Sequence, residues 1–386
     1  MSKKKVFVGL SGGVDSAVSA SLLKDQGYEV IGVFIKTWHP DFLECNEEEE
    51  RLDAMRVAAH LNIPFLTFDL EDVYKKEVAD YMINEYKIGR TPNPDVMCNK
   101  EVKFGAFLKK AISMGADYVA TGHYAIKNSA NGFGKYALGD IGQETHFSKN
   151  HLLNFLLQGV DLFKDQSYFL WTLTQKQLSK ILFPVGNLKK TEVRKMAKKL
   201  NLPVAEKKDS QGICFLGDID LKEFLKHYIK EKKGEVVNTL GEEIGYHDGV
   251  MFHTLGERHG FTITKKSPRD GAYYIIGKDL KKNILIVSQK YAEVQILHKF
   301  TSPQLSPSQR ERKLDLENTN WISKIPEPEK TYTAQIRYHG EFLPCKVKHG
   351  SLASAKVIFQ KHILVASGQS VVIYDKNVCL GGGVVV

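Results

Sequence analysis

The segment Gly9–Ser16, GLSGGVDS, combines residue types that bind phosphate groups. It follows a mostly apolar run, Lys5–Leu10, that predicts a strand, and it precedes a stretch of helical pattern, Ala17–Gln26. A tight glycine turn between a strand and a helix directs backbone N–H groups at an anion. The serines add hydroxyl donors, and Asp15 could hold the Mg²⁺ that accompanies a nucleotide. We therefore predict a nucleotide site made by Gly9, Leu10, Ser11, Gly12, Gly13, Val14, Asp15 and Ser16.

This loop is not of the Walker A type, because it lacks the Gly-Lys-Ser/Thr sequence and hence the phosphate-binding lysine. It resembles instead the SGGxDS loop of ATP pyrophosphatases, which hold the leaving pyrophosphate while AMP is transferred to the substrate. The alternative is a glycine turn without a ligand. Two serines, an aspartate and two adjacent glycines between a strand and a helix favour the nucleotide site.

A second candidate site is the segment Gly89–Lys100, GRTPNPDVMCNK. Its two prolines oppose a helix and predict a rigid loop that presents Asn93, Asp95 and Cys98. Cys98 precedes a predicted helix, Glu101–Met114, and two lysines lie close to it in sequence. A helix N-terminus and nearby cations both lower the pKa of a thiol, so Cys98 is a candidate nucleophile. The alternative is a buried cysteine that only packs.

A third candidate is Cys214, in the glycine-containing loop Glu206–Gly217. A thiol in a basic, glycine-punctuated loop is a candidate for oxidation or for carrying sulfur, although its spacing fits a core cysteine equally well. The chain has five cysteines and no CxxC pair, so its cysteine pattern indicates neither a zinc site nor an iron–sulfur cluster.

The elements that must position these groups alternate between strands and helices over about the first 125 residues. Runs of β type lie at Glu29–Ile35, Pro64–Leu70 and Asp117–Ala125, and helical spacing occurs in Glu47–Leu61 and Val73–Tyr86. This alternation predicts an α/β fold with a doubly wound parallel sheet. Ligands bind beyond the carboxyl ends of such strands, where the glycine loop, Ile35 and Gly122 would converge.

The length of 386 residues predicts two or three domains. We expect a catalytic domain over residues 1–205, a central domain over 206–290 and a C-terminal domain over 291–386. The last is rich in short β runs from Tyr332 onward and predicts a small antiparallel barrel or sandwich. The apolar piece Leu152–Leu157 has a helix-like pattern.

The composition is that of a folded protein, with 42% hydrophobic and 26% charged residues. No apolar run approaches the roughly 20 residues of a membrane span, and the basic start passes directly into the first predicted strand, so we expect a cytoplasmic protein. The net charge of +9 is compatible with a polyanionic partner. Lysines and an arginine crowd residues 189–208, as either a solvated face or a phosphate-binding stripe.

Eight motifs, in order along nearly the whole chain, resemble the bacterial tRNA-specific 2-thiouridylase family of the MnmA type. They are GLSGGVDS, GRTPNPDVMCNK, ATGHY, KDQSYFLW, FPVG, KKDSQGICF, HTLGERHG and CLGGG. The resemblance implies an ATP-pyrophosphatase-type catalytic domain, a small central domain that contacts tRNA and a C-terminal β-barrel. Compared with that family, the segment near 141–158 is an insertion in the catalytic domain. The resemblance also implies ATP-dependent thiolation of C2 of the wobble uridine in tRNAs for Lys, Glu and Gln. The implied partners are ATP, Mg²⁺ and a cysteine desulfurase or sulfur-relay donor protein.

The same resemblance implies roles for individual residues. Gly9–Ser16 would bind ATP, with Ile35, where many relatives have Met, and Gly122 completing the pocket. The target base would meet Asn93, Pro94 and Asp95, and tRNA would contact Lys164, Asp165, Gln166, Arg337 and Tyr338. Cys98 would be the nucleophile and Cys214 the carrier of a persulfide. Asp95 could also act as a general acid or base.

Two sulfur-transfer routes and two other functions stay open. Either the terminal sulfur of the persulfide attacks C2, or Cys98 attacks the persulfide and frees hydrosulfide, which leaves a Cys98–Cys214 disulfide for cellular thiols to reduce. The first alternative function is an ATP-pyrophosphatase-type ligase or amidotransferase acting on a small molecule, which needs the loop but not the two thiols. The second is a tRNA-binding protein with a vestigial nucleotide site, against which the intact Ser11, Asp15 and Ser16 argue.

Overall fold

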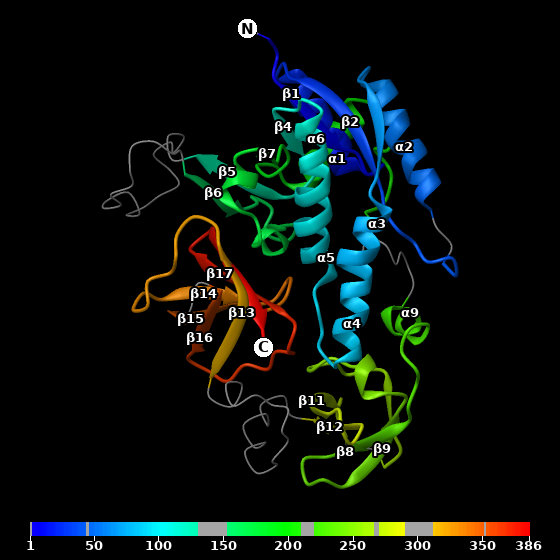
Figure 1. Cartoon of the computed structure of the whole chain (residues 1–386), viewed down its shortest axis with the longest axis vertical. Helices are drawn as coiled ribbons and strands as arrows, with labels where there is room; N and C mark the ends of the chain where they lie inside the picture. Colours follow the sequence, from blue (N-terminus) through cyan, green and yellow to red (C-terminus); the bar gives the residue numbers. More distant parts are fainter. Residues whose placement is uncertain are drawn as a thin grey trace.

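The computed structural model describes residues 2–43, 46–129, 153–209, 220–265, 270–289, 312–350 and 353–386. Its N-terminal part is built on a five-stranded sheet in the order β3-β2-β1-β4-β7 (Figure 1). The strands are β1 (Lys5–Gly9), β2 (Glu29–Lys36), β3 (Phe65–Asp69), β4 (Tyr118–Ala120) and β7 (Ile181–Leu182). Each neighbouring pair in this sheet is parallel, which confirms the predicted sheet.

Helices cover both faces of this sheet. Successive residues of β1 point to opposite faces, and each face packs into its own hydrophobic cluster. Val6 and Val8 pack with the helices of one face, whereas Phe7 packs with those of the other. The first face carries α1 (Val14–Asp25), α2 (Glu47–His60) and α8 (Lys190–Lys199). The second carries α3 (Glu71–Tyr74), η1 (Lys75–Asp80), α4 (Tyr81–Lys87), α5 (Pro94–Met97), η2 (Cys98–Phe107) and α6 (Leu108–Ser113).

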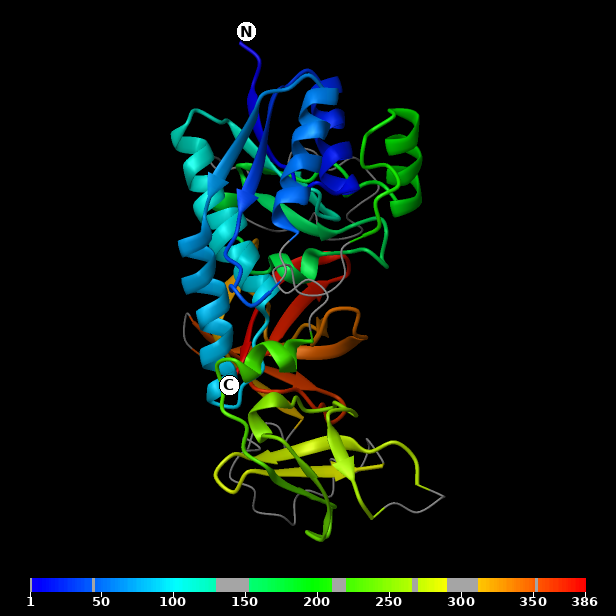
Figure 2. The ribbon, with the colours of Figure 1, turned by 90° about the vertical axis from the view of Figure 1, so that its right-hand side faces the viewer.

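The helices of the second face reach from the sheet toward the central domain (Figures 1 and 2). There, α4 contacts η5 (Val250–Phe252). The central domain contains a five-stranded sheet in the order β10-β9-β8-β12-β11, with a small apolar core of its own. Its elements are α9 (Leu221–Lys226), β8 (Gly234–Val237), β9 (Glu243–His247), β10 (Phe261–Ile263), β11 (Tyr274–Asp279) and β12 (Ile284–Ser288).

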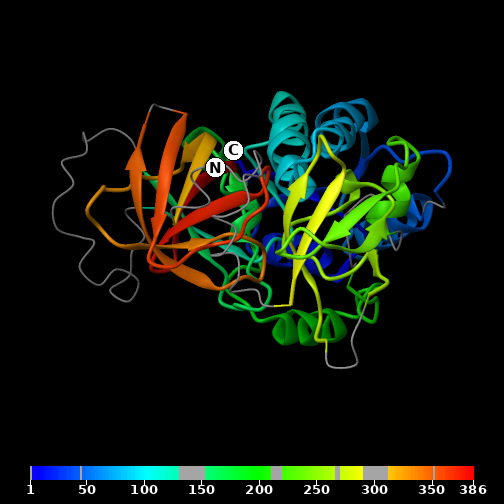
Figure 3. The same cartoon turned by 90° about the horizontal axis from the view of Figure 1, so that it is seen from below.

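The C-terminal strands form a closed six-stranded antiparallel barrel, because β13 pairs with β16 on one side and with β18 on the other. The predicted barrel is confirmed. Seen from below, the barrel and the central sheet lie side by side (Figure 3). The strands are β13 (Lys313–Trp321), β14 (Tyr332–Gln335), β15 (Phe342–His349), β16 (Ser354–Phe359), β17 (Ser370–Asp375) and β18 (Val378–Val385).

Two strands of the N-terminal part extend the sheet of the barrel. β5 (Ala125–Ser129) pairs with β6 (Asn154–Gln158), and β6 pairs with β18 through Leu157 opposite Val378. The helix-like interpretation of Leu152–Leu157 is therefore wrong. Leu156 and Leu157 are both buried but belong to different hydrophobic clusters, so this strand is apolar on both faces. A continuous apolar run of that kind cannot be distinguished from a helix by periodicity.

Two short helices, η4 (Ser167–Leu170) and α7 (Gln175–Leu178), connect β6 to β7. The domain boundaries at 205/206 and 290/291 stay predictions, and most of the predicted insertion near 141–158 lies outside the described residues. Within the described part of the chain, no helix has the length and apolar character needed to cross a bilayer.

Candidate nucleotide and thiol site

The loop between β1 and α1 lies at the carboxyl edge of the parallel sheet, where the strand order reverses between β1 and β4. Gly12 has a φ of +72°, and a Cβ there would lie 2.5 Å from the carbonyl oxygen of Glu50, so only glycine fits. Gly13 is the N-cap of α1, and no side chain of the described residues caps that helix. The first turn of α1 thus keeps the backbone donors that bind an anion.

Hydrogen bonds of the Ser16 hydroxyl fix the shape of this loop. The backbone N–H of Ser11 donates to Ser16 Oγ at 3.2 Å, and Ser16 Oγ donates to the carbonyl of Gly13 at 3.0 Å. Gly122, just beyond β4, packs against the same turn, since a Cβ there would lie 2.8 Å from the Ser16 nitrogen. The structure therefore brings Gly122 against the loop, as predicted, while the half-buried Ile35 lies near the end of the adjacent strand β2.

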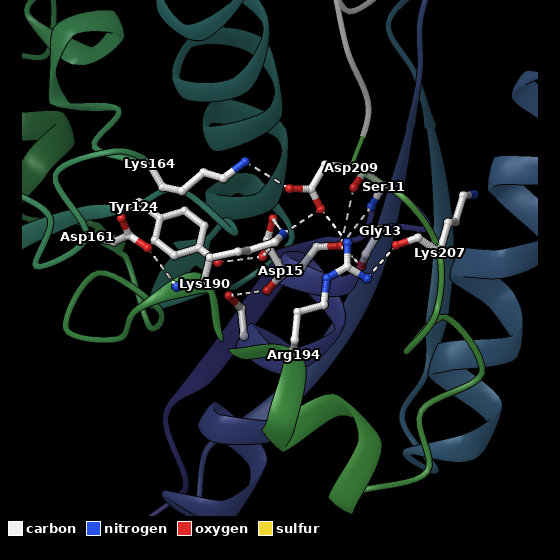
Figure 4. A network of polar contacts seen from close by, with 12 residues as sticks. Ser11, Gly13, Asp15, Tyr124, Asp161, Lys164, Lys190, Arg194, Lys207 and Asp209 are labelled. Carbon is white, nitrogen blue, oxygen red and sulfur yellow. Dashed lines mark hydrogen bonds and ion pairs between the residues drawn. The ribbon is translucent and has the colours of Figure 1, made fainter. Parts of the chain in front are cut away.

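Asp15 belongs to an ion-pair network in which Asp209 has the most partners (Figure 4). Both carboxylate oxygens of Asp15 lie 2.8 Å from Lys190 Nζ, and Tyr124 OH donates to Oδ1 at 2.7 Å. Lys190 Nζ also lies 2.8 Å from Oδ1 of Asp209, which pairs in addition with Lys164 at 2.9 Å. Burial opposes the ionisation of Asp209, but hydrogen bonds from the two lysines hold its pKa well below the usual range.

This network was not predicted from the sequence. In the sequence, Lys190 and Arg194 are members of a basic cluster, and Tyr124 and Asp209 are parts of motifs, with no pattern that pairs them. Arg194 pairs with Asp209 and also donates to the backbone carbonyl of Ala205 at 3.1 Å. Three cationic side chains therefore gather beside the glycine loop, as a phosphate site requires: Lys190 and Arg194 from α8, and Lys164 from the chain before η4.

Cys98 lies in the first turns of a helix rather than before one. Asn93 is the N-cap, its Oδ1 accepting a hydrogen bond from the N–H of Val96 at 3.2 Å, and Pro94 is the first helical residue. Proline is tolerated at the first helical position because a backbone N–H there has no hydrogen-bond partner within the helix. The predicted rigid loop, with a helix beginning only at Glu101, is therefore wrong.

The helix places Cys98 and Asp95 at different depths. Cys98 is 4% exposed and belongs to the core cluster that also holds Phe7 of β1. Asp95 is half-buried, and this burial raises the pKa of its carboxyl group, against the charge of Lys103. A carboxyl group with a raised pKa exchanges protons closer to neutral pH, which suits a general acid or base.

Tyr338 of the barrel lies next to this helix. Its ring centroid is 4.4 Å from that of Phe169, and burial together with the charges of Asp165 and Asp95 raises its pKa to about 12. The barrel therefore contributes an aromatic side chain to the surroundings of Asp95.

Cys214 lies outside the described residues, but the chain leading to it is placed. Asp209, the last described residue before it, belongs to the network around Asp15.

Three family models match successive parts of the chain. That described as tRNA methyl transferase HUP domain matches residues 4–218, the tRNA methyl transferase PRC-barrel domain matches 222–289, and the Aminomethyltransferase beta-barrel domain matches 311–385. The chain is 43% identical over 385 residues to the tRNA-specific 2-thiouridylase MnmA of Listeria monocytogenes, covering 99% of this chain and 94% of that protein. The chain belongs to the tRNA-specific 2-thiouridylase family. Its identity to the same enzyme of Methylobacillus flagellatus is 39% over 388 residues, covering 99% of both.

Solved structures resemble this 2-thiouridylase family member more distantly. The U34-tRNA thiolase NcsA from Methanococcus maripaludis has a TM-score of 0.33 and 16% identity, covering 59% of this chain and 67% of that one. A 4-thiouridine synthetase–RNA complex with bound ATP has a TM-score of 0.33 and 17% identity, covering 58% and 50% respectively.

In this member of the 2-thiouridylase family, the segment Lys164–Gln166 makes mainly internal contacts. Asp165 is 7% exposed, and its carboxylate accepts hydrogen bonds from Gly159, Ser167 and Gln158 at 2.9–3.1 Å. Gln166 exchanges hydrogen bonds with the backbone of Tyr124 at 2.9 and 3.0 Å. Both side chains thus position the neighbouring loops, and their predicted contacts with tRNA stay predictions.

Arg337 lies elsewhere, on a cavity of about 780 Å³ between the barrel and the central domain. The segments 254–257 and 361–366 line the same cavity. The structure therefore separates Arg337 from the network around Asp15, whereas its sequence neighbour Tyr338 lies beside α5.

Thr91 joins all three domains two residues before the cap of α5. Its N–H donates to the carbonyl of Ser367 at 2.8 Å, and its carbonyl accepts from Gln369 Nε2 at 2.8 Å. Its hydroxyl lies 3.1 Å from that of Thr254, in the central domain. The helix that carries Cys98 is therefore anchored at its start by both the barrel and the central domain.

Lys278 also contributes to this junction between the domains, and replacing its ammonium group should weaken the junction. Its Nζ donates to the carbonyls of Gly89 at 3.0 Å and His253 at 2.6 Å. Burial lowers its pKa to about 8, yet even the neutral amine keeps two donors for these carbonyls. We expect Lys278→Met to lower the thermal midpoint of unfolding by roughly 3–8 °C, because two carbonyls lose their donor.

Lys281→Met is the matched control for calorimetry, since Lys281 is exposed in the same hairpin. We expect it to change the midpoint by less than about 2 °C. Equal midpoints for the two variants would contradict a role of Lys278 at the junction.

Proposed function

We propose that this chain is a tRNA 2-thiouridylase that uses ATP to replace the C2 oxygen of the wobble uridine with sulfur. The observation that carries the proposal is the connection through Asp209, which joins the nucleotide loop to the segment that bears Cys214. Membership of the family over 99% of the chain supports the same activity. The proposed substrates are the tRNAs for Lys, Glu and Gln in the cytoplasm.

The first half of the reaction makes the C2 oxygen a leaving group. That oxygen attacks the α-phosphorus of ATP, the bond from this phosphorus to the bridging oxygen breaks, and pyrophosphate departs. The glycine loop and the N-terminus of α1 offer backbone donors to the departing phosphates, where charge develops. The base would lie against Asn93, Pro94 and Asp95, and Asp95 would move protons as general acid or base.

Mg²⁺ would arrive with ATP, and it neutralises phosphate charge when bound. No group of three or more His, Cys, Asp or Glu side chains within the described ranges could hold a metal ion. Asp15, in the first turn of α1, is the one carboxylate of the glycine loop and fits a metal held mainly by phosphate oxygens.

The second half transfers sulfur. A cysteine desulfurase or relay protein would load Cys214 with a persulfide, whose terminal sulfur forms the new bond to C2 as AMP leaves with the former C2 oxygen. Cys98 breaks the S–S bond of the persulfide, either after that attack or before it by releasing hydrosulfide. Both orders end in a Cys98–Cys214 disulfide, which cellular thiols reduce with two electrons.

The small-molecule ligase is the weaker candidate. It would use the nucleotide loop, but it gives no role to Cys98, Cys214 or the two C-terminal domains. The predicted tRNA contacts of Lys164, Asp165, Gln166, Arg337 and Tyr338 belong to the proposed function.

The test is mass analysis of nucleosides from tRNA incubated with the protein, ATP, Mg²⁺, cysteine and a cysteine desulfurase. We expect 2-thiouridine at the wobble position only when ATP is present. The ligase would be favoured if the wobble uridine stayed unmodified and pyrophosphate were released in the presence of a small molecule but not of tRNA.

A further inference from the structure

We propose that Lys190 supplies the phosphate-binding lysine that the glycine loop lacks, as a ligand of the pyrophosphate leaving group. We further propose that Asp209 is an internal anion that occupies this lysine until the phosphates of ATP replace it. Both statements rest on the proposed function, since they concern the same nucleotide site.

The position of Lys190 carries the first statement. Its ammonium group lies 2.8 Å from both oxygens of Asp15, a residue of the first turn of α1. Its side chain is 14% exposed, and its own N–H donates to Asp161 Oδ2 at 2.9 Å, which fixes the start of α8. A lysine held beside the N-terminus of α1 meets the same phosphates as the backbone donors of that turn.

The contacts of the two aspartates show which of them would leave. Asp15 has a second partner, the hydroxyl of Tyr124 at 2.7 Å. This hydroxyl is neutral, so a phosphate would not draw it away from Asp15 by charge. The side-chain partners of Asp209 are cations, namely Lys190, Lys164 and Arg194 (Figure 4). Asp209 is therefore bound to the same cationic groups that would bind a phosphate.

Charge decides the outcome of this competition. A carboxylate brings one negative charge to the three cations, whereas bound pyrophosphate brings several and has more acceptor oxygens. The phosphates would therefore displace Asp209 from Lys190 and Lys164. Without ATP, the same carboxylate pairs with Lys164 and Arg194 and gives Lys190 a second anionic partner besides Asp15.

The experiment is calorimetric titration of the full chain with inorganic pyrophosphate and Mg²⁺, and separately with AMP. We expect Lys190→Met to weaken pyrophosphate binding at least tenfold, with AMP affinity within about twofold, because one charge-assisted contact is lost. Lys195→Met is the control, since Lys195 is exposed on the same helix and its loss removes the same charge. We expect it to weaken binding less than twofold.

Asp209→Asn tests the second statement in the opposite direction. Removing the competing charge should strengthen pyrophosphate binding by about three- to tenfold, whereas a purely structural aspartate would give unchanged or weaker binding. Lys190→Arg, which keeps the charge, should retain most of the affinity. This variant and Asp209→Asn decide the question if Lys190→Met does not fold.

The outcomes separate this inference from the proposed function. Equal weakening by Lys190→Met and Lys195→Met would overturn the assignment of Lys190, and unchanged or weaker binding by Asp209→Asn would overturn that of Asp209. A wild-type chain that binds pyrophosphate but forms no 2-thiouridine would contradict the proposed function alone.

Discussion

Replacing Cys98 with serine should lower the formation of 2-thiouridine at least about 10³-fold, because a neutral hydroxyl does not attack a persulfide. Release of pyrophosphate that depends on tRNA should stay within about threefold of wild type, since adenylation does not use this thiol. Serine is close to cysteine in size, so the buried position should accept it. The two measurements are nucleoside mass analysis and a pyrophosphate assay under single-turnover conditions.

Cys345→Ser and Cys379→Ser are the matched controls, because both residues are buried cysteines of the barrel. Burial raises the pKa of Cys345 to about 12 and that of Cys379 above its usual range, so neither is a thiolate at neutral pH. We expect both variants to keep thiolation. If Cys98→Ser lost both half-reactions together, Cys98 would be a packing residue instead of a nucleophile.

The parallel sheet and the barrel could be predicted because their strands are bounded by turns and alternate with recognisable elements. The start of α5 could not, because Pro94 signals a break in most contexts and is favoured only once Asn93 acts as the cap. The strand Asn154–Gln158 was also missed, since its partners are β5 and β18, and β18 lies more than 200 residues away. Pairing over such separations has no local pattern.

The candidate site shows the same division between local and distant information. Glycine, serine and aspartate within eight residues predicted the nucleotide loop, because one turn makes the whole cradle. The ammonium of Lys190 meets Asp15 across 175 residues of sequence, and Tyr124 meets it across 109. Such contacts depend on how α8 packs on the sheet and on the path of the chain after β4. Composition could indicate that basic residues were plentiful, but not which carboxylate each would meet.

Replacing Gly122 with alanine should reduce pyrophosphate release about 10²-fold while most of the fold is kept. The added Cβ would lie 2.8 Å from the nitrogen of Ser16 and 2.9 Å from the carbonyl carbon of Asp15. Both are backbone atoms of the first turn of α1, so the turn itself has to move. A displacement of this kind misaligns the phosphates, and a misplacement of about 1 Å can cost a factor of 10² in rate.

Gly271→Ala is the control, since a Cβ at this exposed position would meet no atom within 4 Å. The thermal midpoint of Gly122→Ala should fall by a few degrees, as expected from overpacking by one methyl group. Catalysis would thus be reduced much more than stability, because the clash falls on the turn that aligns the reacting phosphates. A Gly122→Ala enzyme with wild-type pyrophosphate release would show that the first turn of α1 does not contact the leaving group, and the nucleotide site would then have to lie elsewhere on the sheet edge.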